Sequence, residues 1–349
     1  MSKSYTKESP AGFEKRKAEH ISLALAPENQ ASDCSTFNTI QLIHEALPEL
    51  NFNDVSIEST RWGKPTRTPF FVSSMTAGHA GAIDINDVLA NACSQTGWAM
   101  GVGSQRRQLF DANHKNEWET ISTRYPSVNF FANIGIAQII GTPVEQLEQL
   151  VDSLSAEALI VHLNPLQETL QPEGTPNFTG SLDAITQLTD HISVPVIIKE
   201  TGCGFTASTL QRLNGTGIAA VDVSGLGGTH WGRIEGKRAQ ESTWQAIAAQ
   251  TFKSWGISTI DSLIAAKSLE LNFEIWGSGG VRSGLDAAKC IALDATSIGL
   301  AKPLLDSALQ GVDAVVSTMQ QFEDELRIAL FCTGSATVSA LKEKYHVIT

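Results

Sequence analysis

Gly277-Ser-Gly-Gly-Val-Arg-Ser-Gly284 and Ala295-Thr-Ser-Ile-Gly-Leu-Ala-Lys-Pro303 are the two stretches that decide the fold. The first follows a short apolar run, Phe273–Trp276, and the second contains another, Thr296–Leu300. Two successive strand-to-loop turns, the first rich in glycine, are typical of the last two βα units of a (β/α)8 barrel that binds a phosphate. Glycine lets backbone N–H groups approach phosphate oxygens, and a following helix N-terminus adds positive potential. We therefore expect the other site residues at the carboxyl ends of the six earlier strands.

Eight short runs of strand character recur along the chain, and stretches with helical spacing of apolar residues separate them. Continuous apolar strands joined by helices predict a parallel sheet covered on its outer face, and eight units favour an α/β fold closed into a (β/α)8 TIM barrel. The predicted strands are Phe70–Ser74, Ala99–Gly103, Val128–Ile134, Ala158–Leu163, Val194–Lys199, Ala219–Val223, Glu274–Gly277 and Thr296–Leu300. The predicted helices include Asp84–Thr96, Thr142–Ser155, Ser181–His191, Ala207–Asn214 and Leu285–Leu293.

Two regions depart from this alternation. Residues 1–69 precede the first strand and are predicted to form an N-terminal extension that packs on the barrel. Residues 70–349 are predicted to form one domain, the barrel with a C-terminal helical segment. The sixth βα unit is oversized, at 225–272, and its opening Gly225–Arg238 is too polar and glycine-rich for a helix. We expect a long lid loop there, after strand six.

Composition excludes several classes of function. The 349 residues carry a formal net charge of −12, which disfavours binding to nucleic acid, and are 42% hydrophobic and 18% charged, as in ordinary soluble proteins. No apolar run approaches the roughly 18 residues of a membrane span, and the N-terminus lacks the apolar segment of a secretory signal. We therefore expect a cytoplasmic protein. The five cysteines have no Cys-x-x-Cys spacing, which favours reduced thiols and argues against a zinc site.

Polar residues follow most of the predicted strands, where the rim of a barrel lies. Ordinary turn chemistry explains such a residue at any single position. It explains the whole set poorly, because solvated loops do not require an asparagine, a lysine and a Gln-Glu pair directly after apolar strands. Strand ends converge on one face of a barrel, so these residues are expected to share one site. They are Ser73–Gly78, Gly103–Arg106, Asn133, His162–Glu168, Lys199–Glu200 and Ser224.

The motifs resemble those of the type 2 isopentenyl-diphosphate isomerases, FMN-dependent barrels that interconvert isopentenyl and dimethylallyl diphosphate. The resemblance runs from Arg16 to about Leu305. Its most specific part is the motif at 162–168, whereas many FMN barrels share the glycine-rich turn. The matching motifs are Arg-Lys-x-x-His-Ile (16–21), Ser-Met-Thr-Ala-Gly (74–78), Gly-Ser-Gln-Arg (103–106), Asn-Ile-Gly (133–135), His-Leu-Asn-Pro-Leu-Gln-Glu (162–168), Val-Ile-Ile-Lys-Glu (196–200) and Gly-Gly-Thr-x-Trp-x-Arg-Ile-Glu (227–235).

This resemblance implies a role for each matching position. The residues implied to hold FMN are Met75, Thr76 and Ala77 beside the ring, Ser104 and Asn133 as hydrogen-bond partners, Lys199 near the pyrimidine edge, Ser224 and Thr229 along the ribityl-phosphate arm, and Gly279, Gly280, Val281, Arg282, Leu300 and Ala301 around the phosphate. Those implied to contact the substrate diphosphate are Arg16, Lys17, Ser104, Gln105 and Arg106. Glu168 would hold Mg2+ on the diphosphate, and Gln167, with His162 and Asn164, would lie next to the reacting carbons as the catalytic set.

Several of these residues also have plainer interpretations. Lys199 could be paired with Glu200, and Arg16 and Lys17 could be a solvated charge run, the commoner fate of such pairs. His162 is as easily a hydrogen-bonded core histidine as a functional one. Cys203 has no evident histidine partner in the sequence, so inert packing is favoured over a nucleophilic role. The motif at 74–78 also departs from the family, with Ala77 where glycine is common.

The reaction that the resemblance implies moves a double bond by one carbon. It needs one proton added and another removed two atoms away, without net redox change. Gln167 cannot titrate and Glu168 is assigned to the metal, so the hypothesis is that reduced FMN serves as acid and base, as the resemblance also implies. NADPH would reduce the flavin by binding transiently in the same mouth. The family further implies a homo-tetramer or homo-octamer.

Two other functions remain open from the sequence. The first is an FMN-dependent 2-hydroxyacid oxidase or dehydrogenase, whose chemistry needs a histidine base and an arginine on the late loops. His230 and Arg233 could form that pair, although the Gln167-Glu168 motif has no purpose there. The second is a flavin-storage or scaffold protein without catalysis.

Overall fold

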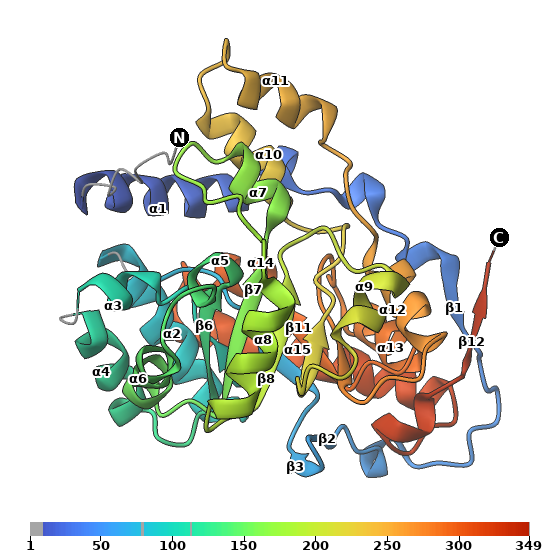
Figure 1. The fold of residues 1–349 in the computed structure, drawn as a ribbon. Coiled ribbons are helices and arrows are strands. Elements are labelled where there is room, and N and C mark those ends of the chain that lie inside the picture. The colour runs from blue at the N-terminus through green and yellow to red at the C-terminus, as the bar shows by residue number, and fades with distance from the viewer. Residues whose placement is uncertain (1–9, 78–79, 112–113, 349) are drawn as a thin grey trace.

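Eight parallel strands close into a barrel in chain order, which confirms the predicted (β/α)8 fold (Figure 1). The computed structural model describes residues 10–77, 80–111 and 114–348. Each observed barrel strand overlaps one of the eight predicted runs. The strands are β4 (Phe70–Val72), β5 (Ala99–Gly101), β6 (Phe130–Gly135), β7 (Ala158–Leu163), β8 (Val196–Glu200), β9 (Ala220–Asp222), β10 (Glu274–Gly277) and β11 (Ser297–Leu300).

The barrel interior is filled by side chains, many of them aromatic. The rings of Phe71, Phe131 and Trp276 contact one another inside the strands, with centroids 5.1–6.1 Å apart. Alternate residues of each strand face outward into the larger core beneath the helices. Because both faces of the strands are buried, the strands are continuously apolar until their carboxyl ends, and polar side chains concentrate there.

The barrel helices include all five that were predicted, with ends shifted by up to four residues. The clearest difference is α2, which already begins at Ala80. Among the described residues, no helix is both long and apolar enough to cross a membrane. The helices between and after the strands are α2 (Ala80–Thr96), α3 (Arg106–Phe110), α4 (Lys115–Arg124), α5 (Ile136–Ile139), α6 (Val144–Leu154), α7 (Pro165–Leu170), α8 (Ser181–His191), α9 (Ala207–Leu213), α12 (Thr259–Lys267), α13 (Gly284–Ala292), α14 (Lys302–Ala308) and α15 (Val312–Cys332).

The N-terminal extension reaches both ends of the barrel. Helix α1 (Pro10–Leu25) contacts α10 and α14 at the carboxyl ends of the strands, and the hairpin of β2 (Ser59–Arg61) and β3 (Lys64–Thr66) lies at the opposite end (Figure 1). Trp62 of the hairpin turn packs against the interior rings. Within its described residues the extension also holds four short 3₁₀ helices, at Pro27–Asn29, Ser32–Cys34, Phe37–Thr39 and Phe52–Asp54. Its strand β1 (Ile40–Leu42) pairs antiparallel with β12 (Tyr345–Val347), which follows a further 3₁₀ helix at Val338–Leu341.

The segment after β9 is more helical than predicted. We expected no helix at 225–238, but α10 spans Trp231–Arg238, and α11 (Trp244–Thr251) follows it. The His230 side chain caps α10 by accepting a hydrogen bond from the backbone N–H of Arg233, and Glu235 is buried against α1. Packing against α1 and α7 therefore stabilises a helix that its glycines and charges disfavour locally. Helices α1, α7, α10 and α11 gather over one end of the barrel (Figure 1).

Candidate active site

Two adjoining cavities open at the carboxyl ends of the barrel strands, beneath α1 and α10. We call the first the glycine-rich cavity and the second the polar cavity. Lys199 and Trp231 line both, so the two form one continuous site. The predicted residues of the glycine-rich cavity are Met75, Thr76, Lys199, Ser224, Thr229, Gly279, Gly280, Val281, Arg282 and Ala301. Those of the polar cavity are Arg16, Lys17, Ser104, Arg106, Asn133, His162, Asn164, Gln167 and Glu168.

The glycine turn after β10 depends on glycine at two positions. Gly279 has φ +93° and Gly280 φ +77°, conformations that L side chains rarely adopt. A Cβ on Gly280 would also lie 2.6 Å from the carbonyl carbon of Gly227. The turn after β9 and the turn after β10 therefore pack backbone against backbone. The guanidinium of Arg282 is held there by donating to Gln30 Oε1, at 2.8 Å. The extension thus braces the turn that was predicted to bind phosphate.

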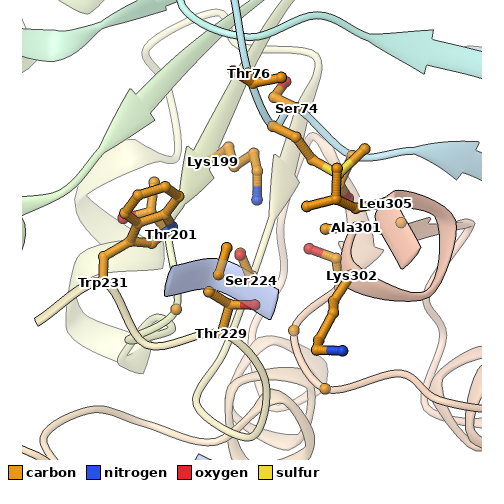
Figure 2. Close-up of a pocket in the computed structure, with 18 of the residues that line it drawn as sticks. Ser74, Thr76, Lys199, Thr201, Ser224, Thr229, Trp231, Ala301, Lys302 and Leu305 are labelled. Atoms are coloured by element: carbon orange, nitrogen blue, oxygen red, sulfur yellow. The ribbon is translucent and has the colours of Figure 1, made fainter. Parts of the chain in front are cut away.

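Lys199 ends β8 and extends into the glycine-rich cavity (Figure 2). Its Nζ lies 3.2 Å from Asp222 Oδ2 and donates to the backbone carbonyl of Glu200. The carboxylate of Glu200 instead accepts hydrogen bonds from the backbone N–H groups of Thr201 and Cys203. Burial raises the pKa of Glu200 to about 7. The ion pair of Lys199 is therefore with Asp222 and not with its neighbour in sequence.

Three buried oxygens in this region have no hydrogen-bond partner among the residues that the structure describes. They are Ser73 Oγ, Ser74 Oγ and Asp222 Oδ2, whose contact with Lys199 is ionic but poorly directed for a hydrogen bond. Ser73 and Ser74 line the glycine-rich cavity. Because buried polar atoms are rarely left unpaired, the two serine hydroxyls indicate a polar ligand in the cavity, whereas Asp222 faces Lys199 and does not line it.

A network of amides and one carboxylate forms the floor of the polar cavity. Asn164 Nδ2 donates to Gln167 Oε1 at 3.0 Å and to Glu168 Oε1 at 3.1 Å. The other carboxylate oxygen of Glu168 accepts from the backbone N–H of Thr175. Helix α7 carries Gln167 and Glu168 directly after the end of β7, which is why the sequence motif predicts this grouping. Glu168 is buried yet still borders the cavity, where a cation could reach it.

His162 is a neutral hydrogen-bonding group in this site. One ring nitrogen lies 2.7 Å from Asn133 Oδ1 on the neighbouring strand. Burial lowers the pKa of His162 to about 3, and the nearby charges of Lys17, Lys199 and Arg106 act in the same direction. His162 is therefore both a hydrogen-bonded, partly buried histidine and a residue of the cavity wall.

This lowered pKa gives a stability prediction. Between about pH 3 and 6.5 the unfolded chain binds more protons at position 162 than the folded chain, so the free energy of unfolding falls as pH falls through that window. We expect His162→Gln to lose less stability between pH 7 and pH 5 than the wild type, in urea unfolding at both pH values. The matched control is His191→Gln, at an exposed position on α8, which should keep the wild-type difference. Equal losses for wild type and His162→Gln would contradict the prediction.

The polar cavity has a basic wall that the extension supplies in part. Arg16 and Lys17 come from α1, and Arg106 is the first residue of α3, which follows β5. Arg16 is only 8% exposed, so it is not part of a solvated charge run. In an acidic chain, three cations in one cavity create a local site for an anion.

Sequence reasoning had not singled out four residues of this region: His20 and Trp231, which line both cavities, and Glu235 and Arg238, which pack behind them. His20 Nε2 is 3.0 Å from Glu235 Oε1, and the His20 ring meets Trp231 edge to face. Gln167 Nε2 also donates to Glu235 Oε1, at 3.2 Å, and Arg238 pairs with the other oxygen. All lie within or next to the motifs at 16–21 and 227–235. Their position in these motifs is the feature of the sequence that could have identified them as site residues. Asp222 was missed as well, although it lies within the predicted strand Ala219–Val223 and ends the observed strand β9.

Three predicted residues do not line either cavity. Gln105 is 1% exposed and turns away: its amide donates to the carbonyl of Leu150 and accepts from the backbone N–H of Asn133. Gln105 thus positions the end of β6, and the structure does not bring it to the diphosphate contacts expected of it. Ala77 and Leu300 are buried beside residues that do line the glycine-rich cavity. Gly78 lies outside the described residues.

The structure also places the pair required by the alternative oxidase or dehydrogenase. His230 is fully buried, and its ring bonds the carbonyl of Trp255 and the backbone N–H of Arg233. Arg233 donates to backbone carbonyls of Gln30 and Lys253, which ties the lid to the extension. Neither side chain lines a cavity. This geometry gives both residues structural roles and leaves the alternative function without its carboxylate-binding pair.

Comparisons with known proteins agree with the barrel fold. The family model of FMN-dependent dehydrogenases matches residues 137–348. Among solved structures, a flavocytochrome b2 mutant with benzoylformate superposes with a TM-score of 0.69 at 17% identity, covering 95% of this chain and 82% of that chain. A mandelate oxidase mutant with (S)-mandelic acid superposes at 0.64 and 16% identity, over 99% and 100%. At these identities the likeness shows the barrel fold alone.

Curated relatives are much more similar in sequence. An isopentenyl-diphosphate delta-isomerase of Legionella pneumophila (strain Lens) is 56% identical over 332 residues, which is 95% of this chain and 97% of the relative. One from Bdellovibrio bacteriovorus is 49% identical over 341 residues, covering 97% and 98%. Together with the FMN-dependent dehydrogenase match, these relatives show that the chain belongs to the family of isopentenyl-diphosphate delta-isomerases.

Proposed function

We propose that this protein interconverts isopentenyl diphosphate and dimethylallyl diphosphate, with reduced FMN as the acid and base and Mg2+ on the diphosphate. The observation that carries the proposal is the junction of the two cavities. A glycine-turn cavity with a buried lysine adjoins a cavity that has a basic wall and one carboxylate. The first suits a flavin and the second suits a diphosphate, and Lys199 lies where they meet.

FMN fits the residues of the glycine-rich cavity. Ser73 and Ser74 offer buried hydroxyls that lack partners, Lys199 offers a cation, and the turn at Gly279–Gly280 offers backbone close to Arg282. A cation near the pyrimidine edge stabilises the negative charge of reduced flavin. When bound and reduced, FMN would supply the proton-transfer group that the side chains lack. Met75 and Trp231, at the junction of the cavities, would shield the reacting carbons from water.

The side chains around the reacting carbons support this division of labour. Gln167 has no titratable proton, and its amide is held by Asn164 and Glu235. His162 is neutral and already bonded to Asn133, so it orients groups and does not supply a proton at neutral pH. We therefore assign Gln167, His162 and Asn164 to positioning the substrate against the flavin.

Mg2+ fits beside Glu168 as a metal shared with substrate. Among the described residues there is no cluster of three or more histidine, cysteine or acidic side chains. The ion prefers one or two carboxylates together with substrate phosphates, and keeps several waters. Glu168 would be its protein ligand, while Arg16, Lys17, Ser104 and Arg106 would contact the diphosphate. This arrangement neutralises the anion without a preformed metal cage.

The reductant, the oligomeric state, the cellular location and the domain bounds are also proposals. We infer that NADPH reduces the flavin by transient binding at the same mouth. The assembly as a homo-tetramer or homo-octamer, the cytoplasmic location, and the division into an extension at 1–69 and a barrel domain at 70–349 remain predictions from the sequence.

An anaerobic isomerase assay with FMN, NADPH and Mg2+, omitting each in turn, tests the proposal. We expect interconversion with all three, loss of activity without FMN or without a reductant, and restoration when dithionite replaces NADPH. Mg2+ chelation should also abolish turnover, because the diphosphate would lose its bridging cation. Turnover with oxidised FMN and no reductant would contradict the acid–base assignment. Bound FMN without any turnover would instead favour the flavin-storage function.

A further inference from the structure

We propose that Asp222 is a positioning residue for Lys199, which fixes the ammonium group at the cavity junction and partly neutralises its charge toward bound FMN. The inference rests on the proposed binding of FMN in the glycine-rich cavity. It adds a residue to which neither the family motifs nor the sequence assigned a role.

The geometry places three polar side chains in a row across neighbouring strand ends. Lys199 on β8 and Asp222 on β9 are register partners. Lys199 Nζ lies 3.2 Å from Asp222 Oδ2, and Ser278, directly after β10, donates to Asp222 Oδ1 at 2.6 Å. The row therefore runs from the lysine to the turn that begins at Gly279. Lys199 and Ser278, at the two ends of this row, both line the glycine-rich cavity, and Asp222 lies behind them.

The burial of this pair is unusual for charged groups. The side chain of Asp222 is 1% exposed and that of Lys199 is 7% exposed. Within the described ranges, Asp222 carries the sole carboxylate within 4.0 Å of Lys199 Nζ, since Glu200 is taken up by backbone N–H groups. Burying a charged pair costs desolvation free energy, so a pair whose lysine lines a cavity and whose aspartate lies behind it is better explained by position and charge control than by stability.

Pairing changes what a ligand experiences from the lysine. An isolated buried ammonium presents a full positive charge, whereas the Lys199–Asp222 pair presents a dipole whose field falls off faster with distance. Oxidised FMN gains negative charge on reduction, so a full charge would favour the reduced form more strongly than the pair does. Asp222 therefore lowers the reduction potential of bound FMN and fixes the place from which Lys199 acts.

The test compares FMN reduction potentials in variants of the full-length holoprotein. Asp222→Asn and Asp222→Ser both remove the carboxylate charge but differ in side-chain size. If one variant fails to fold, the reduction potential can still be measured in the other. We expect a positive shift equivalent to about a tenfold tighter binding of reduced relative to oxidised FMN, about 30 mV for a two-electron couple. The potential is measured anaerobically against a redox dye, and FMN dissociation constants are measured alongside.

Glu274→Gln is the matched control. Glu274 begins β10 at the opposite end of the barrel, where it accepts hydrogen bonds from the backbone N–H of Trp62 and the indole of Trp276. The substitution Glu274→Gln removes one carboxylate charge at the far end of β10 from the cavity, so the reduction potential of FMN should stay at the wild-type value. An unchanged or lower potential in the folded Asp222 variants, or an equal shift in Glu274→Gln, would overturn the inference. A wild-type protein that does not retain FMN would overturn the proposed function as well. Failure of the proposed function is thus distinguished from failure of the role of Asp222 alone.

Discussion

Replacing Glu168 by glutamine is expected to lower kcat/KM of isomerisation about 100-fold or more and to raise the Mg2+ concentration needed for half-maximal activity. Glu168 is the carboxylate of the polar cavity, and its oxygens are oriented by Asn164 and by the backbone N–H of Thr175. Glutamine keeps the size but removes the charge that a divalent cation requires. Anaerobic activity measured as a function of Mg2+ concentration, at saturating FMN, gives both parameters.

Glu173→Gln provides the matched control for this prediction. Glu173 lies a few residues beyond Glu168 but pairs with Arg238 and is partly exposed. Its replacement should change activity less than about twofold, as surface ion pairs contribute little. FMN affinity should be unaltered in both variants, because neither carboxylate lines the glycine-rich cavity. A normal Mg2+ dependence in a folded Glu168→Gln protein would remove Glu168 as the metal ligand.

Lys199→Met is expected to weaken FMN binding about 100-fold, and to leave any bound flavin harder to reduce. Lys199 extends its ammonium group into the glycine-rich cavity, and methionine fills a similar volume without the charge (Figure 2). A buried charge-assisted contact contributes about 1.5–3 kcal/mol, which corresponds to about 10- to 150-fold in affinity. Fluorescence titration of FMN into the apoprotein measures the loss.

The same substitution leaves Asp222 as an uncompensated buried carboxylate. Removing one partner of a buried ion pair typically costs about 3–5 kcal/mol of folding stability. The double variant Lys199→Met/Asp222→Asn should recover most of that stability in urea unfolding, while FMN affinity stays low. A double variant that binds FMN as the wild type does would show that lost stability, and not the missing ammonium group, caused the first effect.

Two residues of the segment after β9, His230 and Arg233, make structural contacts and do not form the carboxylate-binding pair of an oxidase or dehydrogenase. His230 and Arg233 have the residue types of a carboxylate-binding pair, and their sequence neighbours do line the glycine-rich cavity. Arg233 instead donates to carbonyls of Gln30 and Lys253, and His230 caps α10. Successive side chains of a helix point about 100° apart, so residues two positions apart point in nearly opposite directions. Trp231 therefore faces the cavity while Arg233 faces away from it.

Much of the fold and part of the site are determined by local sequence. The eight apolar runs, the helical spacing between them and the glycine turn at 277–284 depend on near neighbours, and each is found where predicted. The grouping of Asn164, Gln167 and Glu168 is equally local, because one short helix after β7 carries all three. Strand closure then brings Lys199 and Asn133 to the same mouth, as the barrel geometry implies.

Tertiary structure alone decided the contacts that join distant segments. His20 and Glu235 are 215 residues apart, and their contact exists only because α1 folds over α10. That packing also stabilises a helix at Trp231–Arg238, against its local composition. A separate long-range contact, the hydrogen bond from the Gln105 amide to the carbonyl of Leu150 on α6, holds Gln105 away from the cavity. The pairing of Lys199 with Asp222 instead of Glu200 follows from strand register. Local patterns specify which face of an element is apolar, but the partner of a buried charge depends on where the closed chain places the nearest opposite charge.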